Sequence, residues 1–580
     1  MKKSGKITAI SGNMITVEFA ESVSQNEVGY VVANQQRLKS EVIRINQNTA
    51  SMQVFEDTKG IKVGDKVEFS GEMISVELGP GLLGQVYDGL QNPLHDLAKE
   101  FGVFLPRGKQ LEAVDSKKKW HFRPKENIKG KKVSAGQPLG YVEEGIFKHF
   151  IFVPFSAKGD LTVEEISSEG DYKVKDKIAV LGNQSGNKIK VTMVANWPVK
   201  VPISAYTQKF TPQESLVTKM RILDTFFPVA KGGTYCIPGP FGSGKTVLQQ
   251  LISRYADVDV VVLAACGERA GEVVETLKEF PKLKDPRTGR SLMERTIVIC
   301  NTSSMPVAAR DASVYTAATL GEYYRQMGLN VLLLADSTSR WAQAMREISG
   351  RLEEIPGEEA YPAYLESRIA EFYERAGQVQ LPFDKKGSLT IGGTVSPAGG
   401  NFDEPVTQST LKVVGAFHGL SRDRANARKY PSVDPLQSWS RYQTPLDKNK
   451  VQKAKDVLTK GDEVDQMMKV VGEEGTSIDD YQVYLKAEFL DAVYLQQNGF
   501  NPVDAATGIK RQTYVFDKIF SILDVKFSFS DKDQARKMFY KLRSLFIDWN
   551  YTEQGSDKYE NLEKEIDQFL SSQKQKEEGE

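Results

Sequence analysis

The feature that most constrains this chain is a glycine-rich stretch near its middle, Gly239-Pro240-Phe241-Gly242-Ser243-Gly244-Lys245-Thr246. It fits the pattern G-x-x-x-x-G-K-[ST] and lies between an apolar segment and one with helical spacing. Such glycines let backbone N–H groups approach phosphate oxygens, and the helix that follows directs a partial charge of roughly +0.5 at the same anions. The stretch therefore predicts a phosphate-binding loop (P-loop). In it Lys245 reaches the β- and γ-phosphates, Thr246 ligates Mg²⁺, and Val247 completes the nucleotide-binding set.

The region around this loop has the pattern of a parallel sheet. From about residue 215 to 430, apolar strand-like segments alternate with helical ones, which is typical of βαβ units. The strand-like segments are residues 234–237, 258–265, 296–300, 331–335 and 388–392. Because they are almost continuously apolar, we expect strands that are covered on both faces.

Two of these predicted strands end in acidic residues. Asp336 follows a Val/Leu run about 90 residues after the P-loop, in the manner of a Walker B acid that holds Mg²⁺. Glu268 follows the apolar run at 260–265 and should project toward the γ-phosphate, where it would polarise the attacking water. Arg269 would neutralise phosphate charge, and Glu272, one turn on, would support the Mg²⁺ hydration shell. A helix-start carboxylate that caps free N–H groups is the alternative for Glu268.

The remaining segments predict three further modules. Residues 1 to about 75 alternate apolar and polar side chains between turn signals, which indicates a small antiparallel barrel. Residues 105–190 are rich in Lys and Gly with recurring strand-like pieces, which indicates a second β module. Beyond about residue 445 the apolar spacing becomes helical, and the charged end at 574–580 is expected to lack fixed structure.

Composition narrows the class of protein. The 580 residues carry 76 Lys plus Arg and 76 Asp plus Glu, so there is no basic excess of the kind that nucleic-acid binding favours. The three cysteines make no disulfide framework and fit reduced, buried thiols, and the four histidines lie at no metal-ligand spacing from them. No segment approaches the roughly 18 apolar residues of a membrane span, and no signal peptide is indicated. We expect a soluble, cytoplasmic protein.

Several stretches, in order along the chain, closely resemble the catalytic A subunits of V-type rotary ATPases. They are 239–246 (GPFGSGKT), 266–269 (CGER), 301–310 (NTSSMPVAAR), 335–342 (ADSTSRWA), 349–357 (SGRLEEIPG), 396–400 (SPAGG) and 494–498 (YLQQN). The second β module is similar to the "bulge" that distinguishes these subunits from F-type β subunits. One departure is Ser243, because eukaryotic members of the family carry Cys there, so thiol-based regulation does not transfer.

The resemblance implies a multidomain α/β fold with a RecA-like P-loop core. The implied domains are a barrel at 1–76, the core at 77–104 and 191–440, an inserted β-rich bulge at 105–190 and a C-terminal helical bundle at 441–580. It also implies ATP or ADP and Mg²⁺ as cofactors, with Glu268 as the catalytic glutamate. Tyr430 matches the aromatic that stacks on adenine, and Phe500 is a candidate for the other wall of that pocket. Plain core packing is the alternative for both rings.

The family further implies partners. Three A and three B subunits alternate in a hexameric ring, and the non-catalytic B subunit supplies an arginine finger in trans, which is worth roughly 10³–10⁵ in rate. Central-stalk and peripheral-stalk subunits complete the head, so the protein is peripheral to the membrane and meets it only through the ion-conducting sector. Residues 352–364 resemble the inward loop that faces the stalk, with a surface turn as the alternative. Whether H⁺ or Na⁺ is moved, and in which direction the reaction runs, is not encoded here.

Two other classes share parts of this pattern. A nucleic-acid motor or a secretion-type ATPase has the same P-loop core, but the bulge-like module and residues 349–357 favour the rotary ATPase. A nucleotide-binding structural subunit, such as the B subunit of the same family, lacks a full P-loop, whereas Lys245, Thr246 and Glu268 are all present here.

Overall fold

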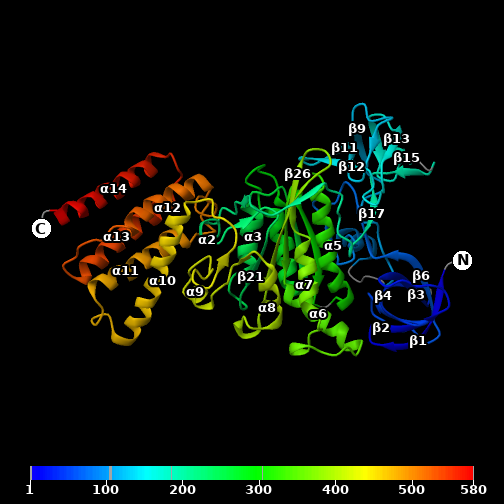
Figure 1. Cartoon of the computed structure of the whole chain (residues 1–580), viewed down its shortest axis with the longest axis horizontal. Helices are drawn as coiled ribbons and strands as arrows, with labels where there is room; N and C mark the ends of the chain where they lie inside the picture. Colours follow the sequence, from blue (N-terminus) through cyan, green and yellow to red (C-terminus); the bar gives the residue numbers. More distant parts are fainter. Residues whose placement is uncertain (1–2, 35, 103–106, 184–185, 304, 579–580) are drawn as a thin grey trace.

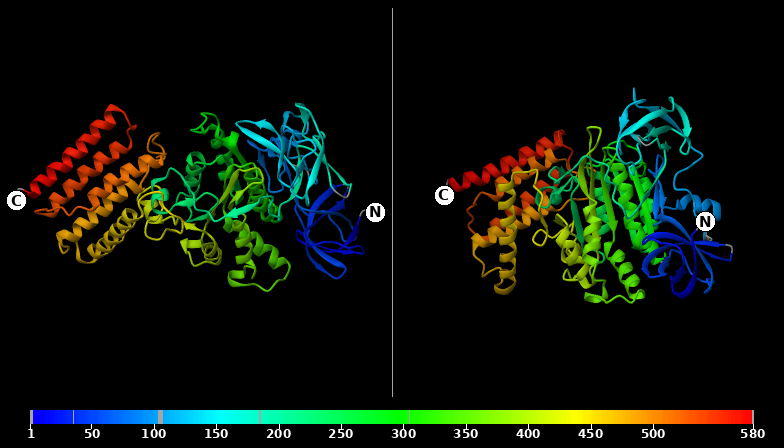
Figure 2. Two further views of the ribbon diagram at one scale, coloured as in Figure 1. Left: turned by 45° about the horizontal axis from the view of Figure 1, so that its top comes forward. Right: turned by 45° about the vertical axis from the view of Figure 1, so that its right-hand side comes forward.

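The structure, a computed structural model, describes residues 3–34, 36–102, 107–183, 186–303 and 305–578. A β-barrel and a second β module lie together at one end of a central α/β core (Figure 1). A helical region lies at the opposite end, so the two chain termini are far apart in every view (Figure 2). This order of modules confirms the predicted multidomain α/β class. None of the helices within the described ranges is long and apolar enough to cross a membrane.

The N-terminal strands close into an antiparallel barrel in the order β1-β2-β5-β4-β3-β6. Their bounds are β1 Ser4–Ser11, β2 Met14–Phe19, β3 Glu27–Ala33, β4 Gln36–Asn46, β5 Thr49–Val54 and β6 Lys66–Met73. Val17 and Val67 are buried in its core, while Glu18 and Lys66 beside them in sequence are exposed. The predicted barrel is confirmed.

The second β module consists of two four-stranded antiparallel sheets, ordered β10-β13-β15-β16 and β12-β11-β9-β14. Their strands are β9 Lys119–Pro124, β10 Lys132–Val133, β11 Pro138–Glu144, β12 Phe147–Phe152, β13 Leu161–Ile166, β14 Gly170–Lys173, β15 Ala179–Gly182 and β16 Lys188–Val191. A two-stranded ribbon of β7 (Ser75–Leu78) and β17 (Ala195–Pro198) ties the two chain connections of the module together.

A ten-stranded sheet forms the core, with the order β28-β27-β21-β26-β24-β22-β23-β8 and β25 and β18 continuing from β26. Its strands are β8 Val86–Tyr87, β18 Gln208–Phe210, β21 Thr234–Pro238, β22 Val260–Glu268, β23 Thr296–Thr302, β24 Asn330–Asp336, β25 Gly377–Gln380, β26 Lys386–Val395, β27 Ala416–Phe417 and β28 Trp439–Ser440. The strands from β27 to β8 run parallel. Every strand predicted in this region is present, and the parallel ends bring the sequence-distant acids to one edge of the sheet.

Helices cover both faces of this sheet. The longest of them, α5 (Val307–Arg325), is buried along nearly its whole length and packs against β22, β23, β24 and β26. The other core helices are α1 Leu94–Phe101, α2 Arg221–Phe226, α3 Lys245–Tyr255, α4 Ala270–Glu279, α6 Thr338–Arg351, α7 Leu365–Glu374, α8 Pro405–Val413 and α9 Arg422–Asn426. Short elements complete the core: β19 Ser215–Leu216, β20 Val229–Ala230, η1 Phe280–Lys282, η2 Leu292–Arg295, η3 Glu358–Ala360 and η4 Ala398–Gly400.

The C-terminal region is helical, as its sequence spacing predicts. It contains α10 Lys448–Val471, α11 Ile478–Leu490, the π-helical turn η5 Asp491–Leu495, α12 Ile509–Leu523, α13 Lys532–Asn550 and α14 Asp557–Glu578. Ile566 is fully buried, and its spaced neighbours Leu562 and Phe569 pack against the same core. The expectation that the charged end lacks structure is wrong for residues 574–578, because α14 continues through them.

One buried polar cluster joins the second β module to the core. His149 on β12 has its Nδ1 2.6 Å from a Glu144 oxygen and its Nε2 2.8 Å from the Tyr323 hydroxyl on α5. Backbone N–H groups of Gly81 and Leu83 donate to the other Glu144 oxygen, at 2.6 and 3.4 Å. Burial works to raise the pKa of Glu144, but His149 and the backbone donors outweigh it and hold the pKa below its usual value.

We expect His149→Ala to loosen this junction. The substitution leaves the buried Glu144 carboxyl without its hydrogen bond to His149, which should cost about 3 kcal/mol of stability, because a buried acceptor then lacks a partner. Thermal unfolding followed by calorimetry measures the loss, and the exposed His95→Ala serves as control. Adding Glu144→Gln to His149→Ala should recover part of the loss, since a neutral amide is less costly to bury. Equal melting temperatures of His149→Ala and wild type would contradict the stabilising role given to His149.

Candidate functional site

The P-loop lies between the end of β21 and the start of α3. Gly244, the residue before α3, has φ +90°, a left-handed conformation that glycine adopts without strain. α3 then begins at Lys245, so the N-terminus of this helix faces the loop. Ser432 fixes the loop from outside, because its hydroxyl donates to the Ser243 carbonyl at 2.5 Å. The loop therefore has the backbone arrangement that anion binding requires.

The Lys245 ammonium lies under the loop and faces three carboxylates. Its Nζ donates to the carbonyls of Gly239 at 2.7 Å and Pro240 at 3.1 Å. Burial lowers the pKa of Lys245, and the nearby carboxylates Asp336, Glu268 and Glu272 oppose that shift. A phosphate group entering the loop would replace the two carbonyls as the acceptor of this charge.

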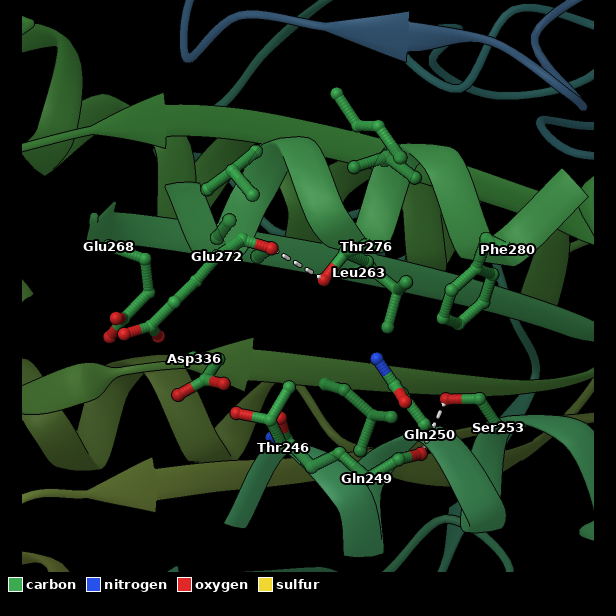
Figure 3. A pocket seen from close by; sticks show the side chains of 16 residues that line it. Thr246, Gln249, Gln250, Ser253, Leu263, Glu268, Glu272, Thr276, Phe280 and Asp336 are labelled. Carbon is green, nitrogen blue, oxygen red and sulfur yellow. Dashed lines mark hydrogen bonds between the residues drawn. The ribbon is translucent and has the colours of Figure 1, made fainter. Parts of the chain in front are cut away.

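The acids and Thr246 line one pocket, which continues between α3 and α4 to Phe280 (Figure 3). Glu268 and Glu272 lie side by side at its mouth, with Asp336 and Thr246 opposite them. Glu268 arrives from the end of β22 and Asp336 from the end of the neighbouring strand β24. The parallel sheet thus brings together residues that the sequence separates.

Glu268 is partly buried and lies close to two other carboxylates. Burial, the charge of Asp336 and a shared hydrogen bond with Glu272 raise the pKa of Glu268 to about 7, while Arg340 opposes the shift. Just before it, Gly267 has φ +75° and the pairing with β23 shifts by one residue, so the chain turns Glu268 toward the pocket. α4 begins without a side-chain cap, so the capping alternative for Glu268 has no support.

Asp336 is fixed by a neighbour on the next strand. The Thr394 hydroxyl on β26 donates to Asp336 Oδ1 at 2.5 Å. Burial raises the pKa of Asp336, and the Thr394 bond and Lys245 partly counter this. An oriented carboxylate opposite a threonine hydroxyl is the pairing that Mg²⁺ uses beside nucleotide phosphates.

Three further predicted site residues, Phe241, Val247 and Arg269, lie at the surface. Arg269 is exposed and its guanidinium lies 5.0 Å from the ring centre of Phe241, which is itself 73% exposed. Arg269 therefore lies beside a residue of the P-loop, and its contact with a phosphate stays a prediction. Val247 on α3 is also exposed.

Tyr430 lies next to the P-loop, and both predicted adenine-pocket rings are exposed. A Cβ placed on Gly244 would be 3.7 Å from a Tyr430 ring carbon. Tyr430 is 46% exposed and Phe500 is 96% exposed, so the core-packing alternative is wrong for both. Gln497 donates its backbone N–H to the Tyr430 carbonyl at 2.8 Å, and this joins the two segments.

The donor set fits Mg²⁺ bound together with a nucleotide. Within the described part of the chain, no three His, Cys, Asp or Glu side chains are grouped so as to hold a metal by themselves. Mg²⁺ commonly takes only one or two carboxylates from the protein and the rest of its ligands from water and phosphates. Asp336 and Thr246 satisfy that requirement, and Glu272 lines the same pocket.

Three contributors to the site were not predicted: Arg340, Thr394 and Ser432. Arg340 lies one helical turn after Asp336, so its spacing could have suggested it. Thr394 and Ser432 reach the site across strands and loops 58 and 189 residues apart in sequence, and no local pattern marks them.

Family models match four consecutive parts of the chain. They are the ATP synthase alpha/beta family beta-barrel domain at residues 7–71, the ATP synthase alpha/beta subunit barrel-sandwich domain at 111–200, the ATP synthase alpha/beta family nucleotide-binding domain at 219–440 and the C-terminal domain of V and A type ATP synthase at 448–528.

Curated relatives are similar over the whole chain. A V-type ATP synthase alpha chain of Treponema denticola is 62% identical over 570 residues, covering 98% of this chain and 97% of its own. One from Borrelia hermsii is 59% identical, covering 99% of both chains. Among solved structures, the assembled ATPase EscN of the enteropathogenic E. coli type III secretion system has a TM-score of 0.62 at 19% identity, covering 89% of this chain and 100% of that one. That likeness concerns the fold alone.

We expect Thr394→Val to weaken the binding of Mg²⁺ at this site. Without the threonine donor, Asp336 loses orientation and its pKa rises further, so the Mg²⁺ concentration for half-maximal ATP hydrolysis should increase by about tenfold. A Mg²⁺ titration of phosphate release tests this. The buried Thr410→Val on α8, which removes a bond to Val406 only, is the matched control. An unchanged titration for Thr394→Val would show that its hydroxyl does not support the metal ligand.

Proposed function

The chain belongs to the family of V-type ATP synthase alpha chains, and from this premise we propose that Glu268 carries the chemistry of its nucleotide site. The activity of the family is that of an ATPase coupled to ion translocation. In the proposed site, Lys245 and the P-loop hold the phosphates of ATP or ADP. Thr246 and Asp336 hold Mg²⁺, and Tyr430 stacks on the base with Phe500 as a second wall.

One observation carries this assignment: a carboxylate with a pKa of about 7 faces the same pocket as Thr246 and Asp336, beside the P-loop lysine. A general base works best when its pKa lies near the working pH. A structural nucleotide site has no need of such a group.

The proposed chemistry assigns each step to a residue of the chain. Glu268 orients a water and accepts its proton as the water oxygen bonds to the γ-phosphorus, and the bond from that phosphorus to the ADP oxygen breaks. Lys245 and the N-terminus of α3 neutralise the phosphate oxygens. Mg²⁺, which Thr246 and Asp336 would hold, would supply further charge neutralisation at the phosphates. The reverse sequence makes ATP.

We further propose the partners that the family implies. A non-catalytic B subunit alternates with this chain in a hexameric ring and supplies an arginine finger, so the isolated chain turns over slowly. Residues 352–364, a surface loop that includes the 89% exposed Ile355, face the central stalk. Peripheral stalks hold the ring, and the head lies on the cytoplasmic side of a membrane, which it meets only through the ion-conducting sector for H⁺ or Na⁺.

The proposed domains follow the modules of the fold. They are the barrel at 1–76, the core at 77–104 and 191–440, the inserted bulge at 105–190 and the helical domain at 441–580. In support, the last barrel strand, β6, ends at Met73, the last strand of the second β module, β16, ends at Val191, and the first C-terminal helix, α10, begins at Lys448. The proposed boundary between 104 and 105 falls outside the described residues.

We expect Glu268→Gln to slow ATP hydrolysis by about 100-fold or more, the range lost with a general base. The amide keeps the shape of the side chain but cannot accept the proton, so ATP binding should persist. Phosphate release by the chain with its cognate B subunit measures turnover, and bound nucleotide is measured in parallel. The exposed Glu275→Gln on α4 is the matched control. Wild-type turnover by Glu268→Gln would overturn the assignment.

The pKa of Glu268 predicts the acid limb of the pH profile. The carboxylate is the active form, so kcat/KM should fall as the pH decreases through about 7, with no such loss above that value. The profile of kcat/KM, which reports the free enzyme, is the measurement. Residual activity of Glu268→Gln should lack this inflection. An inflection retained in the variant would assign it to another group.

A further inference from the structure

The segment that carries Tyr430 is tied to the C-terminal helices by an ion-pair cluster. Asp491 is the first residue of the π-helical turn η5 and is 5% exposed. Its two carboxylate oxygens accept from Arg424 at 2.7 and 3.2 Å, a bidentate contact. Lys429, the residue before Tyr430, donates to the same carboxylate at 2.8 Å. A single buried acid thus holds both ends of the segment from α9 to Tyr430.

The opposite charges in this cluster stabilise one another. Burial works to raise the pKa of Asp491, but Arg424 and Lys429 outweigh burial and hold that pKa below its usual value. Lys429 also donates to Glu488, on α11, at 3.2 Å. Because breaking one member of such a group leaves an uncompensated buried charge, the segment cannot separate from the helices at little cost.

A second contact holds the backbone of Tyr430 against the C-terminal region. Gln497, just beyond η5, donates its backbone N–H to the Tyr430 carbonyl at 2.8 Å. The Gln497 side chain accepts from the Arg221 N–H at 2.8 Å and donates to the carbonyls of Lys219 and Asp504 at 2.9 and 2.7 Å. Gln497 is therefore fixed against the core as well as against Tyr430.

The Tyr430 ring itself has little packing of its own. It is nearly half exposed, and its hydroxyl makes one long bond, 3.4 Å, to the Ala425 carbonyl of the same segment. The position of the ring beside Gly244 therefore depends on the contacts that hold its chain segment, and not on side chains packed around the ring. α11, which carries Glu488 and leads into η5, packs along α10, so these helices would move as a unit.

We propose that Asp491 is a positioning residue that couples the C-terminal helices to the base-binding side of the nucleotide site. Through Arg424 and Lys429 it sets where the Tyr430 ring stands relative to the P-loop. This inference rests on the proposed function, in which Tyr430 stacks on the base.

The proposed coupling predicts that loss of the cluster weakens binding of the nucleotide base and not binding of the phosphates. The P-loop and α3 are built on the core sheet, and the Lys245 ammonium donates to carbonyls of the loop itself. The Ser432 hydroxyl also ties the Ser243 carbonyl to the segment of Tyr430, so we expect the phosphate side to change much less than the base side when Asp491 is lost. Mg-ATP uses both sides of the site, whereas Mg-tripolyphosphate, which has no base, uses the phosphate side alone. Loss of the cluster should therefore reduce the binding preference for ATP over tripolyphosphate.

The experiment measures binding of Mg-ATP and Mg-tripolyphosphate to the full chain by calorimetry. Asp491→Asn should weaken ATP by about tenfold, within the range of coupling between sites, and leave tripolyphosphate within about twofold. In the complex with the B subunit, the KM for ATP should rise more than kcat falls. Asp524→Asn, which breaks the exposed pair with Lys453, is the matched control. A thermal melt confirms folding.

Each other outcome has a defined meaning. If Asp491→Asn weakens both ligands equally or neither, the positioning role is wrong. Tyr430→Ala separates this failure from that of the base site: if it leaves the ATP preference intact, Tyr430 does not stack on the base and the proposed function is at fault. Should Asp491→Asn fail to fold, Lys429→Met removes the more exposed cation and keeps the Arg424 contact. The same selective loss of ATP binding is then expected. If this folded variant weakens the binding of both ligands by the same factor, or of neither, the proposal is overturned.

Discussion

Three carboxylates and one lysine share the same edge of the parallel sheet, and the mutual electrostatics of these groups govern the rest of the site. Glu268, Glu272 and Asp336 repel one another, and Lys245 opposes that repulsion only in part. Burial, together with the negative charges of Asp336 and Glu272, raises the pKa of Glu268 to about 7. A bound divalent cation would offset the repulsion while the phosphates engaged Lys245, so the site favours a metal–nucleotide complex over either component alone.

Such a cluster is stable only on a rigid frame. The strands that end in Glu268 and Asp336 are adjacent, and α5 fills one face behind them with almost no exposed surface. Buried partners such as Thr394 then fix each carboxylate at its place. A looser scaffold would let the acids move apart or recruit water, and the raised pKa of Glu268 would be lost.

The sequence predicts those parts of the molecule whose signals are local. Apolar runs ended by Glu268 or Asp336 predict strands with acids at one edge, and the glycine pattern predicts the loop before Lys245. Contacts between distant segments have no such signal. Thr394 meets Asp336 across 58 residues, and Asp491 meets Arg424 across 67, so only the fold reveals these pairs. Arg269 directly follows Glu268 and its guanidinium lies over the ring of Phe241 in the P-loop, so its predicted phosphate contact stays a prediction.

A nucleotide in this site would span two bodies with different supports. Its phosphates would lie on the core sheet, while its base would meet a segment held to the C-terminal helices by Asp491 and Gln497. The nucleotide can bind favourably on both sides only when the core sheet and this segment lie at the right distance from each other. By linkage, whatever displaces the helices changes nucleotide affinity, and nucleotide binding exerts the same free-energy bias on the helices. An ion-translocating ATPase requires this reciprocity, because the free energy of ATP must be converted into movement outside the site where the chemistry occurs.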